Sequence, residues 1–301
     1  MSTETVDPRY LDLADWPTAT AIEAMLEGQL AAIAAIRSQV SAIAAAAEAA
    51  ATRLGVTGRL VYAGAGTSGR VAVQDGVELF PTYNWPRDRL AFLMAGGTAA
   101  LIESVEGAED DPAAGRAAVA EAAIGANDVV IGVAASGRTP YTLAVIEAAR
   151  VAGALTIGVA NNPGAALLTA AEHAVLAETG SEVVAGSTRM KAGTAQKAVL
   201  NLLSTTIMLR LGLVHRGLMV NMRVSNRKLR ARAERMVAQI AGVDTGAAAR
   251  ALDVAGEEIR QAVLVALGAR VEEAAALLAA HGGNLGAAMA DLTRHASSPR
   301  T

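Results

Sequence analysis

Cysteine is absent from this chain of 301 residues, and aromatic residues make up only 3% of it. Without cysteine the chain has no disulfide, no thiolate metal ligand and no cysteine nucleophile. The 4 histidines are scattered, and no two of them have the i, i+4 spacing with which a helix binds zinc. The sequence therefore predicts no metal site, and chemistry carried by carboxylates, hydroxyls, backbone amides and a few cations.

An excess of charge of one sign is also lacking, because 26 Lys and Arg stand against 29 Asp and Glu, for a formal net charge of −3. Such a chain has no general attraction for nucleic acid and few rings on which bases stack. No uninterrupted apolar run reaches the ~18 residues that span a bilayer. Residues 1–10 lack the basic-then-apolar pattern of a signal peptide. We therefore expect a cytoplasmic protein that binds neither nucleic acid nor membrane.

Residues 1–56 predict an N-terminal helical segment. Apolar residues recur there at three- and four-residue spacing, a stripe that needs a cover, at Ile22, Leu26, Leu30, Ile33, Ile36, Val40 and Ile43. The stretch 42–51 is nearly all alanine, which favours helix and lets neighbouring elements approach closely. We interpret it as a packing helix.

From Gly55 onward, short β-rich runs alternate with stretches long enough for crossover helices, such as Pro112–Ala123 and Pro140–Ala152. The runs are apolar throughout, as in strands covered on both faces, and they are Arg59–Ala63, Leu90–Met94, Asp128–Val133, Leu155–Val159 and His173–Ala177. This alternation predicts a doubly wound α/β domain with a five-stranded parallel sheet over residues 57–220. Residues 221–301 predict a C-terminal helical subdomain punctuated by glycines.

Ligands of such folds bind outside the carboxyl ends of the strands, so the loops there are candidate sites. Gly64–Arg70 follows the first strand; its glycines allow close backbone approach, and the hydroxyls of Thr67 and Ser68 can donate to anionic oxygens. The spacing is that of a dinucleotide fingerprint. The second strand, however, ends in residues 94–97 without the acidic residue that binds the ribose, which argues against NAD or FAD.

A second hydroxyl loop, residues 134–140, follows the third strand and precedes a predicted helix. Ser136 and Thr139, with several backbone amides and the positive helix end, suit a phosphate group. The alternative is that Thr139 simply caps the helix before Pro140. Neither loop has the lysine of a P-loop, so a nucleotide triphosphatase is disfavoured and a single phosphate on a small molecule fits better.

A third candidate is the long segment 180–194 after the last strand. Ser187 and Thr188 could bind polar substrate groups and Lys191 could offset a charge, the alternative being a capped helix start with a solvated lysine.

Two acidic residues complete the set of candidate site residues. Glu78 stands in an apolar stretch, where a carboxyl group tends toward a raised pKa suited to acid–base work. Glu109 lies in an acidic run that is otherwise typical of a solvated turn.

Together these segments resemble the N-acetylmuramic acid 6-phosphate etherase family, a branch of the sugar isomerase (SIS) domain proteins. The resemblance covers most of the chain, and its most specific block is Ser187–Thr194. It implies an SIS-type sheet with N-terminal helices and a C-terminal helical subdomain. It also implies a homodimer with sites near the subunit interface, for which the N-terminal apolar stripe offers a surface.

The resemblance implies a lyase that cleaves the ether between D-lactate and carbon 3 of N-acetylmuramic acid 6-phosphate, by elimination and then hydration. No cofactor is implied. The family's two functional glutamates match Glu78, which would serve the carbon 3 oxygen and the water, and Glu109, which would abstract the carbon 2 proton. The residues expected to bind the sugar phosphate are Gly66, Thr67, Ser68, Ser136, Gly137, Arg138, Thr139, Glu182, Ser187, Thr188 and Lys191.

Two other functions share these loops. Glucokinase regulatory proteins bind sugar phosphates without turnover, although they typically contain two SIS domains and this chain has room for one. Aldose–ketose isomerases of phosphosugars also abstract a proton beside a carbonyl, but they lack the contexts of Glu78 and Glu109. The chain further departs from the family pattern at a few positions, such as Asn221 where an aspartate is usual. A related lyase with a different substrate is thus a further alternative.

Overall fold

Five strands pair into one parallel sheet in the computed structural model, which describes residues 2–297 and the side chains of residues 2–294. The strand order is β2-β1-β3-β4-β5, and the strands are β1 (Leu60–Gly64), β2 (Leu90–Met94), β3 (Val129–Val133), β4 (Leu155–Ala160) and β5 (His173–Leu176). Every residue of β1, β3 and β4 is buried, which is why their sequences are apolar throughout. The predicted doubly wound parallel sheet is confirmed, with each strand boundary within one residue of its predicted place.

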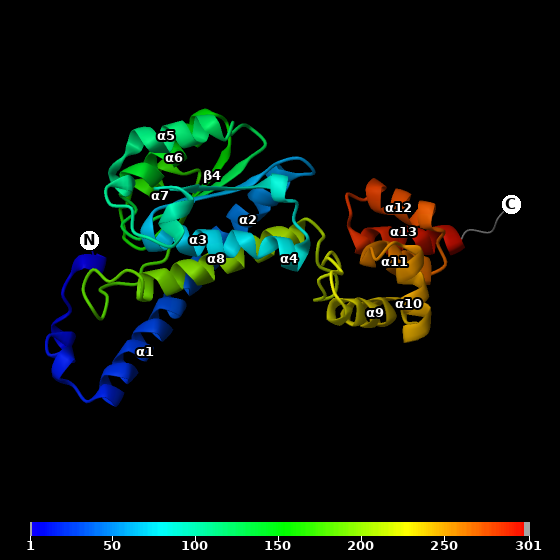
Figure 1. Ribbon diagram of the computed structural model, residues 1–301, viewed down its shortest axis with the longest axis horizontal. Coiled ribbons are helices and arrows are strands. Elements are labelled where there is room, and N and C mark those ends of the chain that lie inside the picture. Colours follow the sequence, from blue (N-terminus) through cyan, green and yellow to red (C-terminus); the bar gives the residue numbers. More distant parts are fainter. Residues whose placement is uncertain (1, 298–301) are drawn as a thin grey trace. The chain divides into compact units, whose positions relative to one another are not determined.

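Helices cover both faces of the sheet (Figure 1). One face carries α5 (Pro112–Glu121), α6 (Pro140–Val151) and α7 (Ala166–Ala170), and the other carries α2 (Val40–Leu54), α3 (Gly66–Val77) and α8 (Lys191–Arg210). Small side chains let α6 approach the sheet closely, because alanines of α6 pack against valines of β1 and β3 in the core. Short 3-10 turns connect these elements, namely η5 (Arg87–Arg89), η6 (Thr98–Leu101) and η7 (Ala108–Asp110).

The predicted N-terminal helices are α1 (Thr18–Ala35) and α2, joined by η4 (Ile36–Gln39). Before them stand three 3-10 turns: η1 (Ser2–Glu4), η2 (Pro8–Tyr10) and η3 (Leu13–Asp15). Ile36 and Ile43 of the predicted apolar stripe are buried. The other five members, namely Ile22, Leu26, Leu30, Ile33 and Val40, are 48–63% exposed, so the described residues leave most of the stripe uncovered.

By length and composition alone, the helical stretch Thr18–Leu54 is long and apolar enough to cross a membrane. Its second half packs against the sheet, since α2 buries Ile43, Leu54 and four alanines. Burial of this kind is typical of a core helix of a globular domain.

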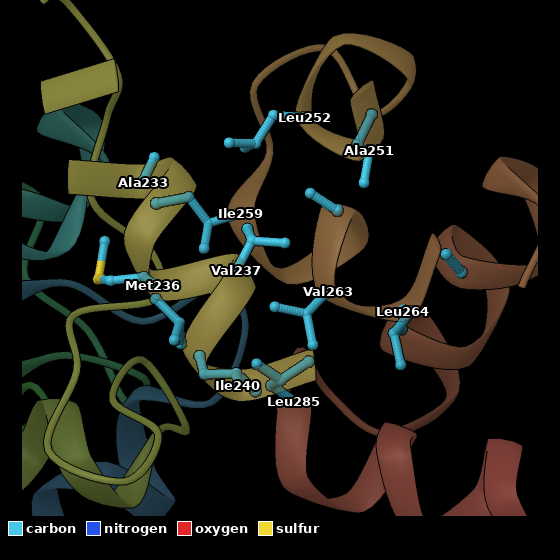
Figure 2. Packing of buried hydrophobic residues seen from close by; sticks show 14 of the residues in the cluster. Ala233, Met236, Val237, Ile240, Ala251, Leu252, Ile259, Val263, Leu264 and Leu285 are labelled. Carbon is cyan, nitrogen blue, oxygen red and sulfur yellow. The ribbon is translucent and has the colours of Figure 1, made fainter. Parts of the chain in front are cut away.

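The chain divides into two compact units, residues 2–77 with 87–206, and residues 78–86 with 207–297. The second unit contains α4 (Leu79–Tyr83), α9 (Arg227–Ala241), α10 (Thr245–Val254), α11 (Ile259–Ala266), α12 (Val271–Ala280) and α13 (Leu285–Ser297). Figure 2 shows its core, where Val237 of α9 and Val263 of α11 lie between Leu252 and Leu285. The predicted glycine punctuation is seen at Gly242, which ends α9 in the left-handed conformation. The domain boundaries expected after residues 56 and 220 remain predictions.

Candidate active site

The strand order creates a switch point between β1 and β3. From β1 the chain first leaves toward β2 on one side, and it later returns to place β3 on the other side. The carboxyl ends are in register, because Gly64 pairs with Met94 and with Val133. Open α/β sheets bind their ligands in the crevice at such a point. The two predicted hydroxyl loops therefore begin side by side, as expected.

The first of these loops turns tightly from β1 into α3. A Cβ on Gly64 would lie 2.8 Å from the Cα of Gly69, so the strand end and the first helical turn can approach only as glycines. Gly66 has φ +52° at the start of α3. Thr67 and Ser68 thus stand in the first turn of a 12-residue helix, where backbone N–H groups and the helix dipole favour an anion.

The second loop turns from β3 into α6. The Ser136 Oγ accepts a hydrogen bond from the backbone N–H of Arg138 at 3.1 Å, and Gly137 has φ +61°. Thr139 precedes Pro140 at the N-cap position, but its hydroxyl makes no capping hydrogen bond. Simple capping therefore does not account for Thr139, whose hydroxyl stands at the N-terminus of α6 beside the Ser136 turn.

Two asparagines after β4 hold this second loop, and sequence reasoning missed them. The fully buried Asn161 donates its backbone N–H to Ala135 O at 3.0 Å, and Asn162 donates from Nδ2 to the same oxygen at 2.8 Å. Asn162 also donates to Thr3 Oγ1 at 3.0 Å and accepts from Ser2 Oγ at 3.0 Å. The N-terminal residues are thereby fastened to the backbone of the Ser136 loop. Two adjacent asparagines directly after a predicted strand were the signal available in the sequence.

The segment 180–194 leads into α8 through a buried carboxylate. Glu182 is fully buried and accepts hydrogen bonds from the backbone N–H groups of Lys191 and Ala192, each at 2.9 Å. Both oxygens thus cap the N-terminus of α8. Lys191 Nζ donates to Ser181 O at 2.8 Å, and burial lowers the pKa of this lysine. Ser187 and Thr188 are half-buried in the turns between them.

This third segment adjoins the first loop. A Cβ built on Gly193 would lie 3.3 Å from Thr188 O and 3.6 Å from Thr67 Cγ2. Thr67 and Thr188, 121 positions apart in the sequence, therefore both lie beside Gly193. The structure brings all three predicted loops to one edge of the sheet.

A cavity of about 240 Å³ opens beside the first loop, at the ends of β1 and β2. Its lining includes Gly66, Arg70, Ala95, Ser104, Glu106 and Glu109. Glu109 stands in η7 with an exposed side chain. Its carboxylate therefore reaches both the cavity and solvent. The two interpretations of Glu109, a solvated acidic turn and a site residue, are thus compatible.

Glu78 directly follows α3 and stands at the N-cap position of α4. Its side chain is exposed, so the apolar surroundings expected from the sequence are not seen. Its apolar neighbours in the sequence do not enclose the carboxyl group, because Leu79 of α4 is buried in the core and Val77 is itself 46% exposed. Glu78 belongs to the second compact unit, and Glu109 to the first.

A buried polar network fixes the last turn of α3, three residues before Glu78. Asp75 is only 5% exposed; its Oδ2 accepts a hydrogen bond from Tyr62 OH at 2.7 Å, and its Oδ1 accepts from Asn201 of α8. Burial raises the pKa of Tyr62 well above its usual range, and the charge of Asp75 acts in the same direction. Sequence reasoning did not single out these residues.

Similarity to known proteins extends over nearly the whole chain. The N-acetylmuramic acid 6-phosphate etherase of Deinococcus radiodurans is 48% identical over 283 residues, which is 94% of this chain and 93% of that protein. The protein of the same name from Streptomyces coelicolor is 47% identical over 96% of this chain and 94% of its own length. That from Symbiobacterium thermophilum is 52% identical over 77% of each chain.

Two family models match overlapping parts of the chain. Residues 39–150 match the glucokinase regulatory protein N-terminal SIS domain, and residues 108–206 match the SIS domain. A solved structure, described as a putative phosphosugar isomerase involved in capsule formation from Bacteroides fragilis, has a TM-score of 0.52 and 18% identity. It covers 67% of this chain and 95% of that chain. The SIS-type fold expected from the sequence is thus confirmed.

Proposed function

The chain belongs to the N-acetylmuramic acid 6-phosphate etherase family, and on that premise we propose how its own residues carry out the reaction of this family. The protein is an enzyme, a carbon–oxygen lyase of amino sugar recycling. It cleaves the D-lactyl ether of N-acetylmuramic acid 6-phosphate and gives N-acetylglucosamine 6-phosphate and D-lactate. The observation that carries the residue assignments is the meeting of three hydroxyl-bearing loops at the switch point of the sheet.

The 6-phosphate binds between the N-termini of α3 and α6. Ser136, Gly137 and Thr139 contact it from one side, and Thr67 and Ser68 from the other. Support comes from the positive φ at Gly137, which turns the backbone at the end of β3, and from the Thr139 hydroxyl, which makes no capping bond. Gly66 and Arg138 border the same site, Gly66 where α3 begins and Arg138 within the Ser136 turn.

The segment 180–194 contacts the sugar through Ser187 and Thr188. Lys191 offsets negative charge of the substrate, and the contact of Lys191 Nζ with Ser181 O holds its ammonium group in place. Glu182 acts indirectly in this proposal, because both of its carboxylate oxygens already bind backbone N–H groups of α8. It fixes the start of the helix on which Lys191 stands.

The chemistry needs one base, one acid and an open-chain sugar. Opening of the ring gives an aldehyde that acidifies the proton on carbon 2, and the Glu109 carboxylate takes that proton. The bond between carbon 3 and the lactyl oxygen then breaks, and the carboxyl group of Glu78 donates a proton to the leaving oxygen. The resulting Glu78 carboxylate takes a proton from water as the water adds to carbon 3, and carbon 2 is protonated again. No metal or redox cofactor enters this scheme.

We further propose a cytoplasmic homodimer. The five exposed apolar residues of the stripe on α1 and η4–α2 form the surface that a second copy covers, since apolar residues at helical spacing are otherwise left in water. A membrane-spanning role for this region is disfavoured because α2 packs on the sheet. Binding to nucleic acid is disfavoured by the balance of charge.

The test is release of D-lactate from N-acetylmuramic acid 6-phosphate by the purified protein. Wild type should release it, and Glu78→Ala and Glu109→Ala should each lower kcat by a factor of about 10²–10⁴, the contribution typical of acid–base groups. Arg116→Ala, at an exposed position of α5, is the surface control. Binding of the substrate without lactate release by wild type would favour a sugar-phosphate-binding regulator, to which the match at residues 39–150 also points.

A further inference from the structure

Arg70 lines the cavity that Glu109 shares, and within the described residues its guanidinium forms no ion pair with a carboxylate. Arg70 stands on α3, and its guanidinium donates from Nε to Ala100 O at 3.0 Å and from Nη2 to Glu103 O at 3.2 Å. Both acceptors are neutral backbone carbonyls, so these bonds orient the guanidinium without compensating its charge. Each carbonyl belongs to the stretch between β2 and Glu109, which holds the arginine at a fixed place beside the glutamate.

We propose that Arg70 binds the carboxylate of the lactyl group, and so determines that the enzyme acts on an acidic ether. The inference rests on the proposed function and adds a specificity residue to the same site. Nε and one N–H of Nη2 are anchored, which leaves Nη1 and the second N–H of Nη2 for a ligand. Arginine presents these donors in a plane that fits the two oxygens of a carboxylate.

The charges in the cavity make such a cation necessary. Glu106 and Glu109 line the same cavity, and an anionic group that enters would meet two carboxylates. Among the lining residues, all of which lie in the described part of the chain, Arg70 is the one cation. A carboxylate could therefore be accommodated here only against the guanidinium, because like charges at close range disfavour binding.

The size of the cavity agrees with a substituent rather than a whole sugar. Its volume of about 240 Å³ is below the ~300–1,000 Å³ of pockets that enclose a drug-sized ligand, and a three-carbon acid is much smaller than that. Carbon 3, which bears the lactyl group, is bonded to carbon 2. With the lactyl carboxylate at Arg70, the carbon 2 proton is thus brought toward Glu109 in the same cavity.

The experiment compares two substrates, N-acetylmuramic acid 6-phosphate and its lactyl amide, which has the same shape without the charge. Both give N-acetylglucosamine 6-phosphate, whose release is measured for wild type, Arg70→Gln and Arg70→Lys. Arg116→Gln, an exposed arginine on α5, is the control. We expect Arg70→Gln to lower kcat/KM for the acid about ten- to a hundred-fold more than for the amide, the usual effect of hydrogen bonds to a charged group. The acid-to-amide ratio of kcat/KM for Arg70→Lys should lie between those of wild type and Arg70→Gln, because lysine keeps the charge but not the planar fork.

Equal losses on both substrates would overturn the proposal, because they would mean that Arg70 only anchors the Ala100–Glu103 stretch. Should Arg70→Gln fail to fold, the acid-to-amide ratio of Arg70→Lys decides the question, since a ratio equal to that of wild type contradicts carboxylate binding. Wild type that releases product from neither substrate overturns the proposed function, and this inference with it. Wild type that is active but does not prefer the acid overturns the role of Arg70 alone.

Discussion

Arg59 and Asp128 join the amino ends of β1 and β3 through two parallel hydrogen bonds, Nη2 to Oδ2 at 2.6 Å and Nε to Oδ1 at 3.0 Å. Asp128 also accepts from the backbone N–H groups of Arg59 and Gly125. Its side chain is 7% exposed and that of Arg59 is 28% exposed, so water screens the pair only partly. The pair lies at the opposite edge of the sheet from the candidate site.

This pair predicts a loss of stability in acid. Burial pushes the pKa of Asp128 upward, but the hydrogen bonds from Arg59 and Gly125 outweigh it, and the pKa of the folded protein is lowered. The stabilisation is therefore complete above the unfolded pKa of about 3.9, and is lost as the pH falls through the lower folded value. Asp128→Asn should cost about 2–4 kcal/mol at pH 7, reduced by the partial exposure of Arg59.

Urea unfolding of wild type and Asp128→Asn between pH 3 and pH 7 checks this, with Asp12→Asn at an exposed position as control. The difference in the free energy of unfolding between wild type and Asp128→Asn should shrink as the pH falls below about 3.9. A difference in stability that stays constant over that range would contradict the assignment.

Capping and phosphate binding are separable at two helix starts. Thr139 makes no capping bond to α6, whereas the Asp111 carboxylate caps α5 by accepting from the backbone N–H groups of Ala113 and Ala114, each at 2.9 Å. Thr139→Ala should raise KM several-fold and leave thermal stability nearly unchanged. Asp111→Ala should destabilise by about 1 kcal/mol. Calorimetric melting together with steady-state kinetics distinguishes them, and a large loss of stability in Thr139→Ala would restore the capping interpretation.

Loss of the hydrogen bond between Thr3 and Asn162 should weaken substrate binding. Thr3→Val keeps the size of the side chain but removes the hydroxyl that accepts from Asn162 Nδ2, so the Ser136 loop loses part of its support. We expect a higher KM with little change in kcat, and recovery in Thr3→Ser, which retains the hydroxyl. If Thr3→Val and Thr3→Ser have the same KM, the contact does not reach the loop.

The exposed stripe on α1 predicts the oligomeric state. Leu26→Glu combined with Leu30→Glu places charge on residues that are 55% and 63% exposed in the single chain, so folding itself should be unaffected. The mass measured by light scattering should fall from that of a dimer to that of a monomer. Val151→Glu is the matched control, because Val151 is an apolar residue that is 90% exposed on α6. A monomeric wild type, or a dimer that survives the double change, would refute this interface.

The sheet was predictable because strands buried on both faces carry uninterrupted apolar runs, and these appear in the sequence wherever the chain enters the core. The two hydroxyl loops were predictable for a related reason. A doubly wound sheet brings the carboxyl ends of its central strands together, whatever residues lie between them.

What the sequence could not supply are contacts set by tertiary packing. Asn162 and Thr3 stand 159 positions apart, and no local pattern links them. Glu182 has the same appearance in sequence whether its carboxylate binds a ligand or caps a helix, and burial alone distinguishes the two. The helical period of residues 22–43 likewise shows a stripe, but not which of its members the sheet covers.

The second compact unit is assembled from two separate pieces of chain, residues 78–86 and 207–297, and Asn221 Nδ2 donates to Tyr83 O across that gap. A recombination event after residue 206 would therefore unite α4 from one parent with the C-terminal helices of another. Descendants that inherit both pieces from the same parent keep this contact intact. Glu78 is the first residue of the earlier piece. The packing around it is therefore preserved only when this piece and the C-terminal helices, which begin more than a hundred residues later, come from the same parent.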